Sequence, residues 1–122
     1  MQTKINWFEI PAHDFGRAVK FYETVFDLKL RVEPYGNAEL GVFTPSEGNS
    51  IGAVAHGEGF IPGAGGVLVY FDAGESIDRV LARIGAAGGR VVLPKTALPQ
   101  DMGYIAHFVD CEGNRVALHG MA

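Results

Sequence analysis

The sequence predicts an α+β protein built from two tandem copies of one βαβββ module. Residues 4–31 and residues 66–93 each read as strand, short loop, amphipathic helix and strand, in the same order. Each copy is followed by further strand-like sequence and a hairpin. A chain of 122 residues can enclose one compact core but not two independent cores. The expected organisation is a single domain over 1–122, with module one over about 3–56, a linker over 57–65 and module two over 66–120.

Module one opens on a predicted strand over 5–10, whose side chains alternate between two faces. Pro11 is expected to end this strand, because proline has no N–H group for the next ladder bond. Asp14 suits the N-cap of a helix over about 16–27, in which apolar residues recur at helical spacing. Three further strands separated by turn-forming residues are expected over 28–32, 38–44 and 50–55.

Module two follows a glycine-rich segment and repeats this order. The apolar strand over 67–71 leads to a helix over about 75–87, and Gly88 and Gly89 supply a C-terminal stop. A short strand and a proline-bounded loop come next, and a pair of strands closes the chain. These segments are expected over 91–93, 94–102, 104–109 and 115–119. The turn over 110–114 predicts a hairpin, with Gly113 available for a positive φ.

Composition excludes several classes of function. The net charge is −4 and the ten Lys and Arg residues are scattered, so no continuous basic surface for nucleic acid is expected. No apolar run approaches the roughly 20 residues of a membrane-spanning helix, and the first residues lack an apolar signal segment. The single cysteine, Cys111, excludes an internal disulfide and a cysteine-rich zinc site. A cytoplasmic protein is the expectation.

Two motifs carry a family resemblance that extends over essentially the whole chain. Arg17-Ala18-x-x-Phe21-Tyr22 follows the first strand, and Asp110-x-x-Gly113-Asn114 lies near the end. In this order they resemble the vicinal oxygen chelate superfamily, which includes glyoxalase I, bleomycin-resistance proteins and extradiol dioxygenases. The resemblance implies curled mixed sheets around a cavity, the glyoxalase/bleomycin-resistance fold. It also implies a homodimer, because a second subunit usually completes the cavity in single-domain members.

The resemblance places the expected metal ligands on residues that cannot bind a metal. In metal-dependent members, His, Gln or Glu ligands occupy four strand positions. These positions fall on Trp7, within 52–54, on Gly66 and on Ala117, and none offers a suitable lone pair. No metal cofactor is therefore favoured. A relocated divalent-metal site on Glu9 and His119, with His56 or His107 as third ligand, is the alternative.

Glu9 and His119 are the candidate catalytic residues. Glu9 shares a strand face with Trp7, and the family pattern turns that face toward the cavity. A partly buried carboxylate there would have a raised pKa and suit a general base. His119 lies two residues beyond Ala117 on the same strand face and could complete an acid–base couple. The alternative for Glu9 is a strand-end carboxylate in solvent without a catalytic role, and the alternative for His119 is a half-exposed histidine without one.

Four residues are candidates for ligand binding. Trp7 and Tyr70, from paired strands of the two modules, could form an aromatic wall with Tyr104. Lys95 lies in a loop that, by resemblance, could cover the cavity mouth and hold an anionic ligand. The alternative for the three aromatic residues is plain core packing, and the alternative for Lys95 is an ordinary solvated lysine. His13 is expected to cap the first helix or to face solvent, and structural roles are expected for His56 and His107. The acidic neighbours of Cys111 should keep its thiol unreactive.

The favoured function is binding of a small organic molecule without metal. Sequestration of the bleomycin-resistance type and a metal-free lyase or isomerase step, with Glu9 abstracting a proton next to a carbonyl, both stay open. A metal-dependent glyoxalase-like lyase, isomerase or dioxygenase with relocated ligands is the alternative enzyme. A third class is an interaction module that kept the fold and lost the site.

Overall fold

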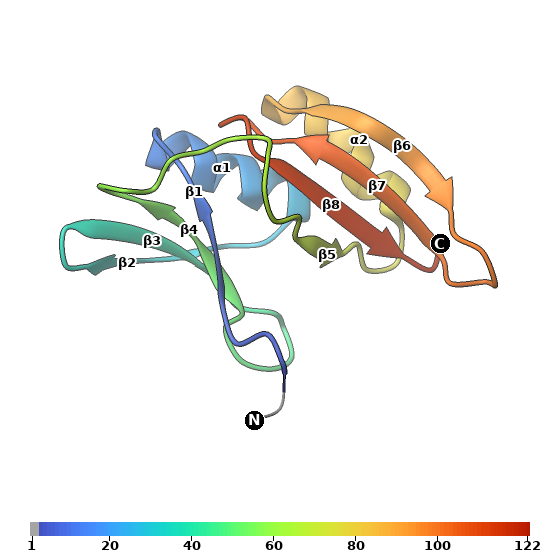
Figure 1. The fold of residues 1–122 in the computed structure, drawn as a ribbon, viewed down its shortest axis with the longest axis horizontal. Coiled ribbons are helices and arrows are strands. Elements are labelled where there is room, and N and C mark those ends of the chain that lie inside the picture. The colour runs from blue at the N-terminus through green and yellow to red at the C-terminus, as the bar shows by residue number, and fades with distance from the viewer. Residues whose placement is uncertain (1–2) are drawn as a thin grey trace.

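A computed structural model describes residues 3–122, so residues 1 and 2 of the expected domain lie outside the description. The two predicted modules appear in order along the chain (Figure 1). The elements of module one are β1 (Phe8–Pro11), α1 (Phe15–Phe26), β2 (Arg31–Tyr35), β3 (Ala38–Phe43) and β4 (Gly52–His56). Those of module two are β5 (Tyr70–Asp72), α2 (Ile77–Ala87), β6 (Arg90–Ala97), β7 (Tyr104–Val109) and β8 (Arg115–Gly120).

Each module forms one four-stranded mixed sheet, and the two sheets have the same topology. Sheet A has the order β1-β4-β3-β2 and sheet B has the order β5-β8-β7-β6. In each sheet the first strand pairs in parallel with the last strand of its module, and the other pairs are antiparallel. The duplicated βαβββ architecture and the α+β class are therefore confirmed.

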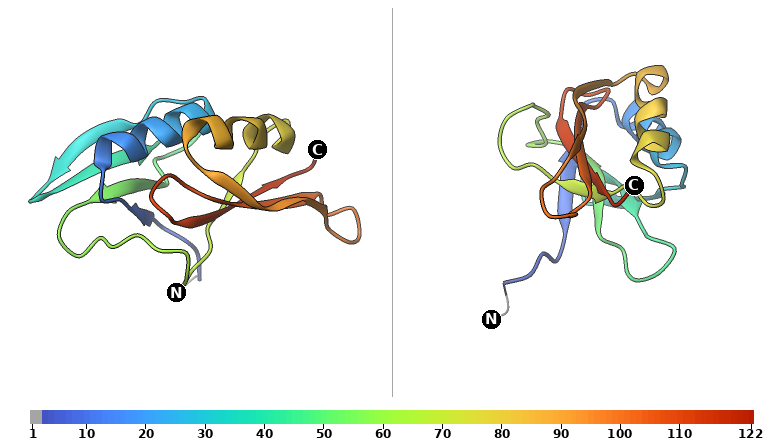
Figure 2. Two further views of the ribbon diagram at one scale, coloured as in Figure 1. Left: turned by 90° about the horizontal axis from the view of Figure 1, so that it is seen from above. Right: turned by 90° about the vertical axis from the view of Figure 1, so that its right-hand side faces the viewer.

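Both helices lie on the same side of the two sheets (Figure 2). Helix α1 packs on α2 and on β4, and α2 packs on the strands of sheet B. The opposite face of each sheet carries no helix, so any ligand site on a sheet lies there. Within residues 3–122 no helix is long and apolar enough to cross a membrane; the longer one, α1, has 12 residues.

An aromatic core joins the two modules. Phe71 of β5 lies 5.4 Å from the ring of Phe8, 4.7 Å from Phe26 and 5.3 Å from Phe43, all residues of module one. Buried aromatic rings contribute large apolar areas and favour such tilted or edge-to-face contacts. The buried cluster therefore runs continuously beneath both sheets.

The helix ends follow the predicted signals. The Asp14 side chain accepts a hydrogen bond from Arg17 N, which satisfies a free N–H of the first turn of α1. Gly88 ends α2 with φ 108°. A Cβ on Gly89 would lie 2.8 Å from the ring of Phe21, so the approach of α2 to module one requires glycine there.

Several predicted strand boundaries are wrong. The strand expected over 5–10 begins at Phe8, and the strand expected over 67–71 begins at Tyr70. The strand expected over 28–32 begins at Arg31, because Asp27 caps α1 in a left-handed conformation and Leu30 turns into the core. Pro11 does end β1, as its last residue, and β1 lies at a sheet edge, where proline is tolerated. The loop expected from Pro94 onward is strand as far as Ala97, because shifts in the β6–β7 register absorb the proline.

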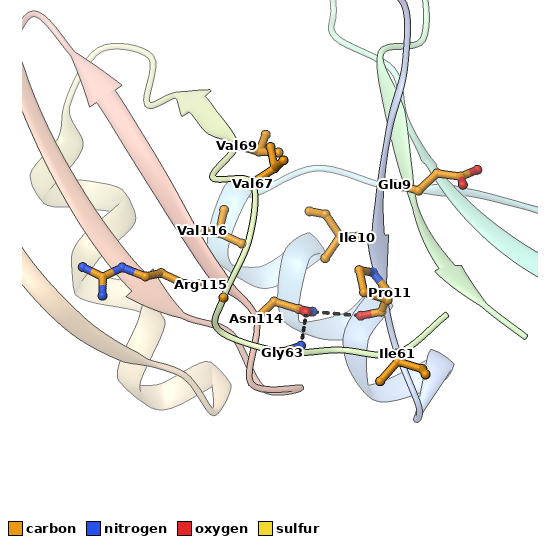
Figure 3. Close-up of a pocket in the computed structure, with 11 residues that line it drawn as sticks. Glu9, Ile10, Pro11, Ile61, Gly63, Val67, Val69, Asn114, Arg115 and Val116 are labelled. Carbon is orange, nitrogen blue, oxygen red and sulfur yellow. Dashed lines mark hydrogen bonds between the residues drawn. The ribbon is translucent and has the colours of Figure 1, made fainter. Parts of the chain in front are cut away.

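The turn between β7 and β8 forms a buried polar junction between the modules. Asp110 Oδ2 accepts a hydrogen bond of 2.6 Å from the Tyr22 hydroxyl of α1, and its Oδ1 accepts from Asn114 N at 3.0 Å. Asn114 Nδ2 donates to the Pro11 carbonyl at 2.8 Å, and its Oδ1 accepts from Gly63 N at 3.0 Å (Figure 3). Gly113 has the expected positive φ, 92°. One turn thus holds β1, α1 and the linker together.

Glu112, in the same turn, caps the start of α1. Its carboxylate accepts hydrogen bonds from the backbone N–H groups of His13 and Asp14 and pairs with Arg17. The Glu112 side chain is only 1% exposed. Burial alone would raise the pKa of Glu112, but the hydrogen bonds from Arg17, Asp14 and His13 outweigh burial and lower it.

Asn114→Ala is expected to lower the free energy of unfolding by about 1–3 kcal/mol, because the part-buried Pro11 carbonyl loses its Asn114 donor and the Asp110 carboxylate loses one of its hydrogen bonds. Urea unfolding followed by circular dichroism measures the change. Asn49→Ala, in an exposed loop, is the matched control and should leave the midpoint unchanged. Equal midpoints for the two variants would contradict the junction's role.

Glu112→Gln is expected to reduce stability in a pH-dependent way. Because the folded-state pKa of Glu112 lies below its ordinary value of 4.5, its ionised form stabilises the fold above pH 4.5. That stabilisation is lost as pH falls through the folded-state pKa. The difference in melting temperature between wild type and variant should therefore be present at pH 7 and shrink below pH 4.5. A difference independent of pH would refute this assignment, and exposed Glu58→Gln is the control.

Candidate functional site

The helix-free faces of the two sheets differ. On sheet A, four small or aliphatic side chains form a buried cluster, and Phe60 of the linker packs against it: Leu40, Val42, Ala53 and Ala55. On sheet B, the corresponding face carries polar groups and half-exposed aromatic surface. The candidate site is therefore on sheet B.

A row of three residues crosses the open face of sheet B. Tyr70 of β5 pairs with Ala117 of β8, and Ala117 pairs with His107 of β7. Neighbouring strands are about 4.8 Å apart, so Tyr70 and His107 are separated by the full width of β8. The Tyr70 hydroxyl nevertheless lies 3.0 Å from His107 Nε2. The side chains bridge over Ala117, which only a small residue at 117 permits.

Arg115 completes the polar row from the other side of the imidazole. Its Nη2 lies 2.9 Å and its Nε 3.3 Å from His107 Nδ1. Arginine can only donate, so Nδ1 is the acceptor and the neutral ring carries its proton on Nε2. Nε2–H then donates to the Tyr70 oxygen. Burial and the Arg115 charge lower the pKa of His107 below its ordinary value of 6.5, which favours this neutral state.

A cavity of about 520 Å³ adjoins this row. Its lining residues are Tyr70, Phe71, Asp72, Leu98, Ile105 and His119. Ile105 pairs with His119 and lies two residues before His107 on the same strand face. His119 Nε2 donates to the Met102 carbonyl at 2.7 Å, which leaves Nδ1 as its free nitrogen. The volume is within the range of small-molecule pockets.

Glu9 lies on a different cavity. This smaller cleft, of about 180 Å³, separates β1 from β8 and is crossed by the linker. Figure 3 shows the Glu9 carboxylate directed away from the centre of the cleft and from Arg115. Glu9 is exposed and accepts a hydrogen bond of 3.3 Å from Trp7 Nε1. The expected partial burial is therefore not found, and one chain does not bring Glu9 and His119 into one cavity.

Lys95 and Tyr104 are together, but on the other side of sheet B. Lys95 Nζ lies 3.0 Å from Asp78 Oδ2 of α2 and 4.5 Å from the centre of the Tyr104 ring. Both side chains therefore face the helix layer. The expected wall of Trp7, Tyr70 and Tyr104 is not assembled within one chain. Trp7 lies just before β1, and β1 and β5 pair with β4 and β8 rather than with each other.

Two further polar side chains have structural surroundings. His56 Nδ1 donates to the Ala12 carbonyl at 3.0 Å, across the start of module one. Burial, with Asp110 and Glu112 nearby, raises the pKa of Cys111 to about 11. Its thiol therefore stays protonated near neutral pH and is a poor nucleophile.

The residues present do not fit a divalent metal site. Within residues 3–122 no three His, Cys, Asp or Glu side chains converge as ligands. His107 has both nitrogens engaged, by Tyr70 and by Arg115. The relocated site on Glu9 and His119 would draw its ligands from two separate cavities.

Arg115 and the site role of His107 were missed by sequence reasoning. A signal was available, because the 110–114 turn places Val109 opposite Arg115 and hence His107 opposite Ala117. The parallel register of β5 against β8, which brings Tyr70 to the same row, leaves no comparable mark in the sequence.

Solved structures share this fold. The fosfomycin resistance protein FosX of Listeria monocytogenes superimposes with TM-score 0.73 at 18% identity, over 98% of this chain and 91% of FosX. TnmS3, an antibiotic binding protein from Streptomyces sp. CB03234, gives TM-score 0.69 at 21% identity, over 98% and 96% of the two chains. Glyoxalase I of Zea mays gives 0.65 at 20% identity over 95% of this chain, which spans 45% of the maize enzyme.

No curated protein matches the chain by sequence. A family model does match it, over residues 4–118, which is nearly the whole chain. The repeated module, the two equivalent sheets and this match agree with the motifs around Arg17 and Asp110. The chain belongs to the Glyoxalase/Bleomycin resistance protein/Dioxygenase superfamily.

Proposed function

We propose that this chain binds a small organic molecule in the cavity on the open face of sheet B, without a metal ion. The observation that carries the proposal is the cavity itself. It has apolar side chains from Leu98 and Ile105 and polar groups at Tyr70, Asp72 and His119. Pockets of this kind bind organic ligands through apolar contact and orient them through a few hydrogen bonds.

The similar structures support a binding role. One is a protein that binds an antibiotic and another confers fosfomycin resistance, on the same fold and over nearly the full length of this chain. Binding alone suffices for sequestration. The acid–base step between Glu9 and His119 has less support, because these residues line different cavities.

We propose binding without a metal because the side chains around the site offer no suitable set of metal ligands. The imidazole nearest the centre of the site, His107, already has a hydrogen-bond partner on each nitrogen. A metal would have to displace Arg115 or Tyr70 to reach it. Ala117, between them, offers no ligand.

The proposal includes a homodimer. Large apolar side chains are exposed where the two modules meet: Val67 is 92% exposed and Ile61 75% exposed, and both line the cleft between β1 and β8. Strands β1 and β5 are edge strands with an unpaired side. A second copy would cover these groups and narrow the open faces of the sheets. A cytoplasmic location and the absence of nucleic-acid partners stay predictions.

Ligand binding is tested by an NMR fragment screen at pH 7. Binding fragments should shift the backbone amides of Tyr70, Ile105 and His119. Leu98→Trp, which fills the cavity, should weaken binding by about tenfold or more, equivalent to about 1.4 kcal/mol. Val32→Trp places the same side chain on an exposed position of β2, away from both cavities, and should leave affinity unchanged. Shifts confined to the cleft between β1 and β8, or no binding at all, would refute the proposal.

The homodimer is tested by light scattering after size-exclusion chromatography. Wild type is expected at twice 13.1 kDa. Val67→Lys should give the 13.1 kDa monomer, because a buried unpaired ammonium strongly opposes association. Val32→Lys, an exposed valine on β2, should leave the dimer intact. A monomeric wild type at high micromolar concentration would contradict the dimer.

A further inference from the structure

We infer that the ligand is an organic acid, whose anionic group is held by Tyr70 and Arg115 over the imidazole of His107. This rests on the proposed function and specifies the class of ligand. The geometry behind it is the polar row on sheet B, in which Tyr70 and Arg115 bond to opposite nitrogens of one imidazole ring.

The hydrogen-bond inventory of the row leaves only donors free. His107 Nδ1 accepts from Arg115, so His107 Nε2–H must donate to the Tyr70 oxygen. The Tyr70 O–H proton is then available to a ligand. The guanidinium of Arg115 has five N–H groups, and its contacts with His107 use Nε and Nη2 only. A group lying over the ring therefore meets a donor on each side and no acceptor.

The positive charge of the row also favours an anionic ligand. Arg115 makes no ion pair with a carboxylate among residues 3–122, whereas Arg17 and Arg31 do. The lowered pKa of His107 favours its neutral form, so Arg115 supplies the positive charge of the row. Hydrogen bonds from a charged donor to an anionic oxygen are roughly twice as strong as neutral ones. A carboxylate is the group that this arrangement recognises best.

The rest of the ligand is apolar and lies toward Leu98. Tyr70 belongs both to the polar row and to the 520 Å³ cavity, so the two are continuous. Asp72, the acidic lining residue, pairs with His119 one row farther from Arg115, and its Oδ1 accepts from Gly74 N. The charges thus orient the ligand, with its acid group at Arg115 and its apolar body over Ile105.

The test compares benzoate with benzamide, a neutral analogue of the same shape, by NMR titration at pH 7. Benzoate should bind more tightly and should shift the ring ¹⁵N resonances of His107. Arg115→Gln should weaken benzoate binding by about tenfold with little effect on benzamide. Tyr70→Phe, which removes the outward O–H, should weaken benzoate binding by a smaller factor.

The matched control is Arg31→Gln, which removes an arginine of sheet A that is paired with Glu33 at 3.1 Å. It should leave benzoate binding unchanged. Equal affinities for the two probes, or an Arg115→Gln variant with wild-type benzoate affinity, would overturn the inference. If neutral fragments occupy the cavity while benzoate does not, the inference fails and the proposed function stands; if nothing binds there, both fail.

Discussion

The buried carboxylate of Asp110 is the interaction on which the rest of the structure depends. A carboxylate away from water is stable only when its oxygens are hydrogen-bonded, and donors come from α1 and from its own turn. Satisfying it fixes the β7–β8 hairpin against module one. The hairpin in turn sets the register of β8, and so decides which side chains of sheet B face away from the helices.

The two modules have the same sheet topology but carry different side chains on their helix-free faces. Glu9 and Ala53 form a cross-strand pair in sheet A that corresponds to Tyr70 and Ala117 in sheet B. In sheet A the next residue of the row is Val42, which is buried in an apolar cluster under Phe60. In sheet B it is His107. The small residue at the centre of each row, Ala53 or Ala117, leaves space above the sheet. In sheet A the linker helps to cover this space, and in sheet B the hydrogen bond between Tyr70 and His107 spans it.

Most of the fold could be predicted from the sequence, because alternation, helical spacing and turn residues act locally. The errors fall where a distant contact overrides them, as when a β-bulge carries β6 past Pro94. The same error affected Lys95, which was expected in a loop over the cavity mouth. Lys95 lies instead in strand β6, where its side chain must face one side of the sheet, and it faces the helices. Tyr104 could have been assigned to the helix side, because it shares its alternation with buried Ala106 and Phe108. The bridge over Ala117 depends on the register of two strands distant in sequence, which local patterns do not encode.

The distance along the chain between Glu112 and the helix it caps has a consequence for how the protein is made. The start of α1 lies almost one hundred positions before its capping carboxylate, and Tyr22 lies 88 positions before Asp110. During synthesis, module one emerges first. The N–H groups at the start of α1 and the Tyr22 hydroxyl then still lack their hydrogen-bond partners, Glu112 and Asp110. Native structure can close only after the last hairpin has left the ribosome. Such long-range contacts slow folding, and we expect the two repeats to fold together rather than one after the other.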